Sequence, residues 1–173
     1  MTRSYAAFVM AAALTVVGCS DTQKSSEPAR TPLVAPASRV QTLVGTVEQN
    51  TTQRLYPAFI LRMDDGTIVG LDGGETSALR SVLGAQIQVD GSMDGDQAFE
   101  VSRFLVLAVG GSPVFDGVLE ATADGAYTIS LTAGGERLIP DAPADLVNYL
   151  GQRIWYMVDQ GNGDSATFGA IRS

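Results

Sequence analysis

The sequence predicts a mainly β protein in which one small unit occurs twice, and three observations support this fold class. After residue 40, short runs of alternating apolar and polar residues are separated by turns rich in Asp and Gly, which is typical of strands joined by hairpins. The order of segments in residues 40–110 recurs in residues 111–173. Each copy also contains one short segment with helical spacing of its apolar residues.

The internal repeat can be followed segment by segment. Gly45 corresponds to Gly117, and Leu83-Gly84 corresponds to Leu150-Gly151. An ordered set of such matches indicates a duplicated unit of about 60–70 residues. The corresponding segments are 44–49 and 116–121, 58–71 and 126–139, 75–84 and 141–151, 85–91 and 152–159, and 98–109 and 166–173.

Hairpins and strands are predicted from turn residues and alternation. Asp64-Asp65-Gly66 between two apolar runs indicates a hairpin, and Ala133-Gly134-Gly135 is its counterpart. In the fourth strand of each copy, alternate residues are expected to face the core. These inward residues are Ile87 and Val89 in the first copy, and Ile154 and Tyr156 in the second.

The segment between the third and fourth strands is predicted to be helical in both copies. A glycine follows each segment, Gly84 and Gly151, and is suited to the left-handed end of a helix. Asp141 is a suitable cap for the second helix. The residues expected to face inward are Ala78, Leu79, Val82 and Leu83 in the first helix, and Leu146, Val147 and Leu150 in the second.

This order, three strands, a helix and two strands, resembles the OB-fold, a five-stranded Greek-key barrel. It is similar to the tandem OB-like barrels of exported bacterial proteins. We therefore expect two tandem OB-like five-stranded barrels, at 40–110 and 111–173, each with a short helix between strands three and four. One larger β-barrel or sandwich made from both halves is the alternative.

The N-terminus is typical of an exported protein. Arg3, an apolar stretch at 5–17 and Gly18 form a secretory signal over residues 1–18. This stretch is too short for a transmembrane helix, which needs about 20 apolar residues. Pro, Ser and Thr dominate residues 19–39, so this segment is predicted to be a disordered tether.

The residues Val16-Val17-Gly18-Cys19 resemble the lipobox of bacterial lipoproteins. The resemblance implies cleavage between Gly18 and Cys19 and a covalent lipid on Cys19, the only cysteine of the chain. Two or three acyl chains anchor a protein stably, whereas one does not. Ser20 resembles the sorting signal for the outer membrane of diderm bacteria, which implies a location on its periplasmic side.

Several kinds of chemistry have no support in the sequence. Without histidine, a Ser-His-Asp or Cys-His site and a His/Cys zinc site are excluded, and we expect no enzyme activity and no cofactor. The formal net charge of −8 argues against nucleic acid as a partner. Asp90, Asp94 and Asp96 have early EF-hand spacing, but Val101 stands where a bidentate Glu is required, so we expect an ordinary turn there rather than a calcium site.

We therefore expect a lipid-anchored, non-catalytic binding or assembly module of the cell envelope. The alternative is a small-ligand or glycan-binding protein that uses the OB face of the first barrel, formed by strands two and three and the loops 49–57 and 93–97. A partner would then be an envelope protein or a glycan. The candidate ligand residues are Arg54, Tyr56, Phe59 and Arg62.

A contact between the two barrels is also predicted. In the fourth strand, the outward positions are Gln88 and Asp90 in the first copy but Trp155 and Met157 in the second. An apolar patch of this kind usually marks an interface. We expect Trp155 and Met157 to pack on the first barrel or on its last strand, 104–109, which includes Phe104 and Leu105.

Overall fold

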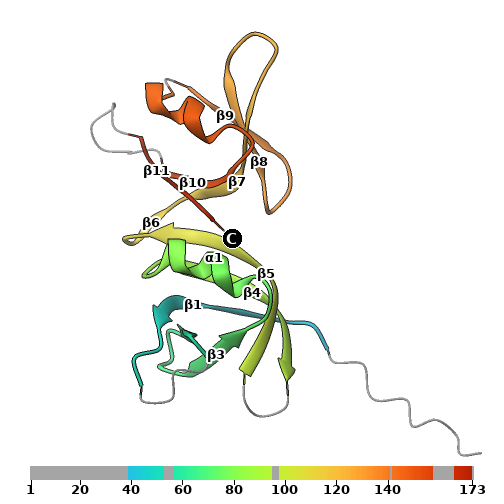
Figure 1. Ribbon diagram of the computed structural model, residues 1–173, viewed down its shortest axis with the longest axis vertical. Helices are drawn as coiled ribbons and strands as arrows, with labels where there is room; N and C mark the ends of the chain where they lie inside the picture. The colour runs from blue at the N-terminus through green and yellow to red at the C-terminus, as the bar shows by residue number, and fades with distance from the viewer. Residues whose placement is uncertain (1–38, 53–56, 95–97, 141, 158–165, 173) are drawn as a thin grey trace, which may run out of the picture. The chain divides into compact units, whose positions relative to one another are not determined.

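The chain is mainly β and forms two sheets of six and five strands, as the sequence predicts. The computed structural model (Figure 1) describes residues 39–52, 57–94, 98–140, 142–157 and 166–172, with only the backbone of Asp94. The expected signal and lipobox, and all of the expected tether except Arg39, lie outside this part of the chain, as do Arg54, Tyr56, Asp96 and Asp141. All described residues belong to one compact unit.

The elements follow the predicted order in both halves. The first half contains β1 (Gln41–Gln49), β2 (Phe59–Arg62), β3 (Ile68–Asp72), α1 (Thr76–Leu79), the 3₁₀ helix η1 (Arg80–Val82), β4 (Gln86–Asp94), β5 (Ala98–Val109) and β6 (Ser112–Pro113). The second half contains β7 (Phe115–Ala121), β8 (Tyr127–Leu131), β9 (Glu136–Ile139), the 3₁₀ helix η2 (Ala144–Tyr149), β10 (Arg153–Met157) and β11 (Thr167–Ala170).

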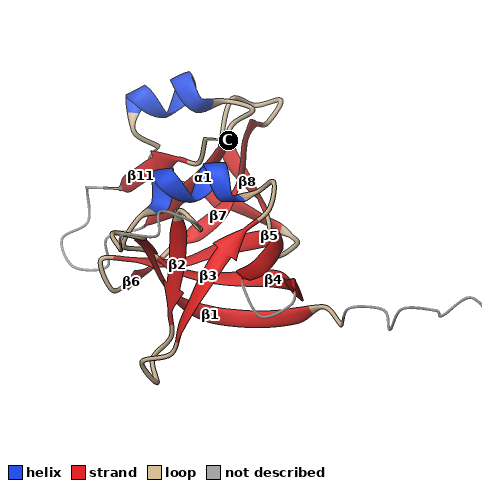
Figure 2. Cartoon of the chain, turned by 60° about the horizontal axis from the view of Figure 1, so that its bottom comes forward, coloured by secondary structure: helices blue, strands red, loops and turns tan. Residues whose placement is uncertain are grey.

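The first sheet closes into a barrel-like ring with OB topology. Its strand order is β3-β2-β1-β4-β5-β6, and a parallel pairing of β3 with β5 closes the ring of the first five strands (Figure 2). Leu71 pairs with Phe99, and Asp72 pairs with Glu100. The two residues of β6 pair with β5, so the first sheet extends beyond Gly110, where the sequence placed the boundary between the halves.

The second sheet has the same strand order without the closing pair. Its order, β11-β10-β7-β8-β9, repeats β5-β4-β1-β2-β3 of the first sheet. Within the described residues, β9 and β11 do not pair, so the second half is an open OB-like sheet there rather than the closed barrel that we expected. Strand β11 has four residues, whereas β5 has twelve, and in the first sheet the early part of β5 makes the closing pair.

Equivalent backbone hydrogen bonds occur in the two halves and support the duplication. In each half, one residue of β1 or β7 donates its N–H to the carbonyl of the residue that follows a positive-φ glycine. The carbonyl of that same strand residue accepts a hydrogen bond from the N–H of the glycine. The glycines are Gly84 (φ +80°) and Gly151 (φ +74°), as predicted for helix ends. The bonds are Val47 N to Ala85 O (3.0 Å) and Gly84 N to Val47 O (2.8 Å), and Leu119 N to Gln152 O (3.0 Å) and Gly151 N to Leu119 O (2.8 Å).

The helical segments are shorter and tighter than predicted, and this corrects three inward assignments. Leu83, Val147 and Leu150 are exposed, at 42%, 47% and 40%. Leu83 and Leu150 come directly after η1 and η2, where the backbone has left the helix (ψ 134° and 133°). Val147 lies within η2, and in a 3₁₀ helix side chains three residues apart lie on one face. In η2, Leu146 is therefore buried and Tyr149, three residues later, packs on the same core.

Each half has its own hydrophobic core. The predicted inward residues of the fourth strands, Ile87, Val89, Ile154 and Tyr156, are all buried. The first core also contains Ile171, which follows β11 of the second sheet. The C-terminal segment of the second half therefore contributes to the core of the first.

Candidate ligand site

The residues predicted to form a ligand face on β2 do not share one surface. Phe59 and Leu61 point into the first core, whereas Arg62 lies on the opposite face of the strand and is exposed. Arg62 forms two hydrogen bonds with Glu48, of 2.8 and 2.9 Å. These bonds lower the pKa of Glu48 and raise that of Arg62. The charge of Arg62 is thus already paired within the protein.

The predicted calcium alternative gains no support from Asp90. Its carboxylate accepts hydrogen bonds from Thr42 (2.7 Å) and from Arg103 (2.7 and 3.1 Å). The hydrogen bond from Thr42, followed by that from Arg103, lowers the pKa of Asp90. Among the described residues, no group of three His, Cys, Asp or Glu side chains is placed to hold a metal ion. The side chain of Asp94 lies outside the described part of the chain.

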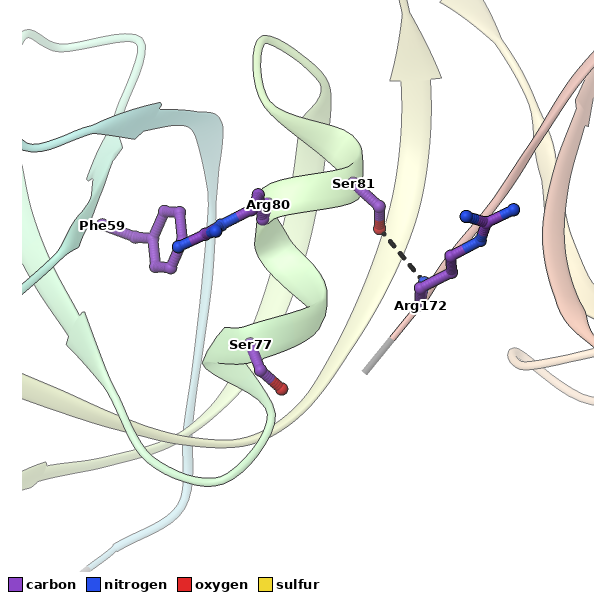
Figure 3. A pocket seen from close by; sticks show the side chains of 5 residues that line it. All are labelled: Phe59, Ser77, Arg80, Ser81 and Arg172. Carbon is purple, nitrogen blue, oxygen red and sulfur yellow. Dashed lines mark hydrogen bonds between the residues drawn. The ribbon is translucent and has the colours of Figure 1, made fainter.

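A hollow of about 420 Å³ lies beside α1 and η1 (Figure 3). We call it the α1 hollow. Three of its residues come from one face of the helical segment, because positions three and four apart are neighbours on a helix. Phe59 of β2 and Arg172, which follows β11, complete the lining. The residues that line it are Phe59, Ser77, Arg80, Ser81 and Arg172.

A hydrogen bond to Ser81 joins the two parts of the α1 hollow. The Ser81 hydroxyl donates to the carbonyl of Ala78 (2.6 Å) and accepts from the backbone N–H of Arg172 (3.3 Å). In Figure 3, the side chain of Arg80 extends from the helix toward Phe59, whereas the guanidinium of Arg172 points away from the helix on its other side. Two arginines therefore line the hollow, and their side chains run in different directions.

The residues predicted to join the two barrels are located as follows. Trp155 of β10 is half-buried and packs against the first core. Phe104 of β5 is buried in that core, whereas Leu105, the next residue, is only half-buried. Met157 is also half-buried. Trp155 pairs in register with Gly169, and a Cβ at Gly169 would lie 2.7 Å from the indole nitrogen.

We predict that Gly169→Ala displaces the indole of Trp155 from the first core. The added methyl group would overlap ring atoms at 2.7–2.8 Å, and the ring must leave its preferred rotamer at a cost of about 1 kcal/mol. The emission of Trp155, the only tryptophan, should shift to the red and become more accessible to iodide. Gly74→Ala, which meets no atom within 4 Å, is the control. An unchanged emission in Gly169→Ala would contradict this placement of the indole.

A buried ion pair connects the second sheet to strand β5. Asp116 of β7 has no exposed side-chain surface, and Arg153 of β10 binds both of its oxygens, at 2.8 and 2.7 Å. Asp116 also accepts from the backbone N–H of Val106 (2.7 Å) and the hydroxyl of Thr132 (3.0 Å). Arg153 donates to the carbonyl of Phe104 (2.6 Å) and lies 4.3 Å from the centre of its ring. We call this arrangement the Asp116–Arg153 pair.

Sequence reasoning missed most of the residues in these two sites. The spacing of Ser77, Arg80 and Ser81 on a helical face was readable as one polar surface, but nothing in the sequence brings Arg172 to it. For the Asp116–Arg153 pair a signal did exist. The repeat places Asp116 and Arg153 where the first half has the uncharged Val44 and Gln86.

Comparisons with known proteins leave the site to be interpreted from its own geometry. No protein family, no curated protein and no solved structure matches the chain. Within residues 39–172 as far as they are described, no helix is long and apolar enough to cross a membrane.

Proposed function

We propose that this chain is a lipid-anchored, non-catalytic module of the bacterial cell envelope that binds a small ligand in the α1 hollow. The observation that carries the proposal is the hollow itself. Its volume of about 420 Å³ falls within the range of roughly 300–1,000 Å³ that is usual for small-molecule sites. Its lining combines an aromatic ring with hydroxyl and guanidinium groups, the mixture of apolar and polar groups found in such sites.

The proposal keeps the small-ligand hypothesis raised by the sequence but moves the site. Phe59 is the one described residue common to the predicted ligand face and the α1 hollow. Arg62, on the other face of β2, is engaged with Glu48. The hollow lies instead at the helical segment between β3 and β4, where one residue from the second half joins four from the first.

The lipid anchor rests on the sequence pattern Val16-Val17-Gly18-Cys19. A cysteine between an apolar signal and a Pro-rich segment is suited to lipidation, and each buried methylene of an acyl chain contributes about 0.8 kcal/mol to membrane binding. A flexible segment of about 20 residues has an average span of about 25 Å. It would hold the folded part clear of the membrane surface.

We predict that Cys19→Ser abolishes lipidation, because the hydroxyl does not replace the thiolate as acceptor. The variant should leave the membrane fraction or accumulate with its signal attached. Intact-mass measurement of the wild-type protein should show a lipid adduct on a chain that begins at Cys19. A mature wild-type chain with a free thiol would disprove the anchor.

Ligand binding in the α1 hollow is tested with a fragment library and a variant that fills the hollow. Ser77 is exposed at its rim, so Ser77→Trp should block it without disturbing the core. Fragments that bind the full-length protein in a neutral detergent, detected by ligand-observed NMR, should no longer bind Ser77→Trp. Ala123→Trp, in an exposed turn of the second half, is the matched control. Equal binding to Ser77→Trp and the wild type would exclude the hollow as the site.

A further inference from the structure

Resting on this proposed function, we propose that the α1 hollow selects small organic anions, that is, ligands with carboxylate or phosphate groups. The argument starts from the charges of the chain. It has 19 acidic and 11 basic residues, so an arginine has many carboxylates available as partners. Arginines that nevertheless lack one are informative, because guanidinium groups pair readily with carboxylate and phosphate.

Four of the seven arginines in the described part of the chain have an ion pair or a ring contact. Three form ion pairs, and Arg137 lies over the ring of Phe115 at 4.7 Å. Within those same described residues, Arg39, Arg80 and Arg172 have neither an ion pair nor a ring contact. Two of these three line the α1 hollow. The paired arginines are Arg62, Arg103 and Arg153.

The rest of the lining is consistent with an anion next to an apolar group. None of the described residues that line the hollow is acidic. The ring of Phe59, 7% exposed, provides an apolar wall. The hydroxyl of Ser77 is a further donor, while that of Ser81 is already used to hold Arg172.

The two guanidinium groups point in different directions in Figure 3. A ligand with two negative groups can meet both once the exposed side chain of Arg172 turns toward the hollow. We therefore expect a rigid dianion to bind more tightly than a monoanion. Because Arg172 follows β11, such a ligand would also hold the C-terminal segment of the second half against α1 and η1.

The test compares matched small probes on the ¹⁵N-labelled full-length protein. Terephthalate is a rigid molecule with two carboxylates, and terephthalamide is its neutral analogue. Benzoate carries one carboxylate, and phenyl phosphate carries one phosphate group. Terephthalate should produce saturable shifts at the backbone N–H groups of Ser81 and Arg172, with weaker binding of benzoate and none of terephthalamide. Arg80→Gln and Arg172→Gln should each weaken terephthalate binding about tenfold, or about 1.4 kcal/mol. Arg39→Gln, which does not line the hollow, is the control.

The outcomes separate this inference from the proposed function. Phenyl phosphate binding more tightly than benzoate would identify phosphate as the preferred group, and the reverse would identify carboxylate. Terephthalamide binding as tightly as terephthalate would overturn anion selection, while the hollow would remain a ligand site. No saturable shift with either class of anion up to about 10 mM, when fragments do bind in the hollow, would also overturn it. Equal effects of Arg39→Gln and Arg80→Gln would do the same.

Discussion

Replacing Asp116 by alanine is expected to lower the free energy of unfolding by about 3–5 kcal/mol, the usual cost of removing one partner from a buried ion pair. The Asp116 side chain is fully buried, and the side chain of Arg153 is 22% exposed. Without the carboxylate, Arg153 would keep its position near the ring of Phe104 with an uncompensated charge. The N–H of Val106 would also lose its acceptor.

The loss of stability is expected to be large because the Asp116–Arg153 pair binds backbone groups of strand β5. One edge of β5 pairs with β4 along its length. On the other edge, β3 pairs near its start and β6 near its end, and no strand among the described residues pairs with the stretch around Phe104 and Val106. Arg153 and Asp116 bind the free carbonyl and N–H of this stretch. Unpaired edge groups are costly when buried, so the pair replaces a missing strand.

Chemical denaturation, followed by far-UV circular dichroism and by the emission of Trp155, measures the change. The control is Glu48→Gln, because the Glu48–Arg62 pair has side chains that are 36% and 45% exposed. An exposed pair contributes little to stability, so this control should unfold like the wild type. A loss in Asp116→Ala of less than about 1 kcal/mol, the range of exposed pairs, would falsify the structural role of Asp116.

The strands and turns of this fold were predictable because they depend on local chemistry. Alternation placed Ile87, Val89, Ile154 and Tyr156 in the cores without any knowledge of the tertiary structure. Asp64-Asp65-Gly66 was predicted as a turn, and Gly66 has the positive φ of +85° that such a turn requires. The type of helix was harder to predict, because the sequence of a segment of three to six residues does not reveal whether it will form an α or a 3₁₀ helix. Val147 was misplaced for that reason, and Leu83 and Leu150 were misplaced because the helical segments end before them.

The sites were less predictable because they depend on contacts between distant residues. Arg172 reaches the helical segment across 91 positions of sequence, and Arg153 reaches Phe104 across 49. Only the repeat offered a guide. At the positions of Asp116 and Arg153, the first half has Val44 and Gln86, so the charged pair distinguishes the second half from the first. A charge present in only one copy of a duplicated strand is a reason to look for a contact that the other copy does not make.

Alanine substitutions at Gly45 and Gly117 are expected to have matching effects, since these glycines occupy equivalent places in the two halves. Strand β1 pairs with both β2 and β4 close to Gly45, and β7 pairs with both β8 and β10 close to Gly117. At these points the backbone of the next strand approaches closely. A Cβ at Gly45 would lie 2.5 Å from the carbonyl oxygen of Arg62, and one at Gly117 would lie 2.2 Å from that of Ser130.

Backbone atoms cannot move aside as a side chain can, so each substitution should lower the free energy of unfolding by about 2–3 kcal/mol, a typical cost of overpacking. Gly74→Ala, which meets no atom within 4 Å, should have little effect. Trp155 belongs to the second half but packs against the first core. Gly45→Ala should therefore shift the unfolding midpoint seen by Trp155 emission together with that seen by circular dichroism. If Gly45→Ala and Gly117→Ala are as stable as Gly74→Ala, the close approach of the neighbouring backbone at these two glycines is wrong. If only the circular dichroism transition moves in Gly45→Ala, the two halves unfold independently.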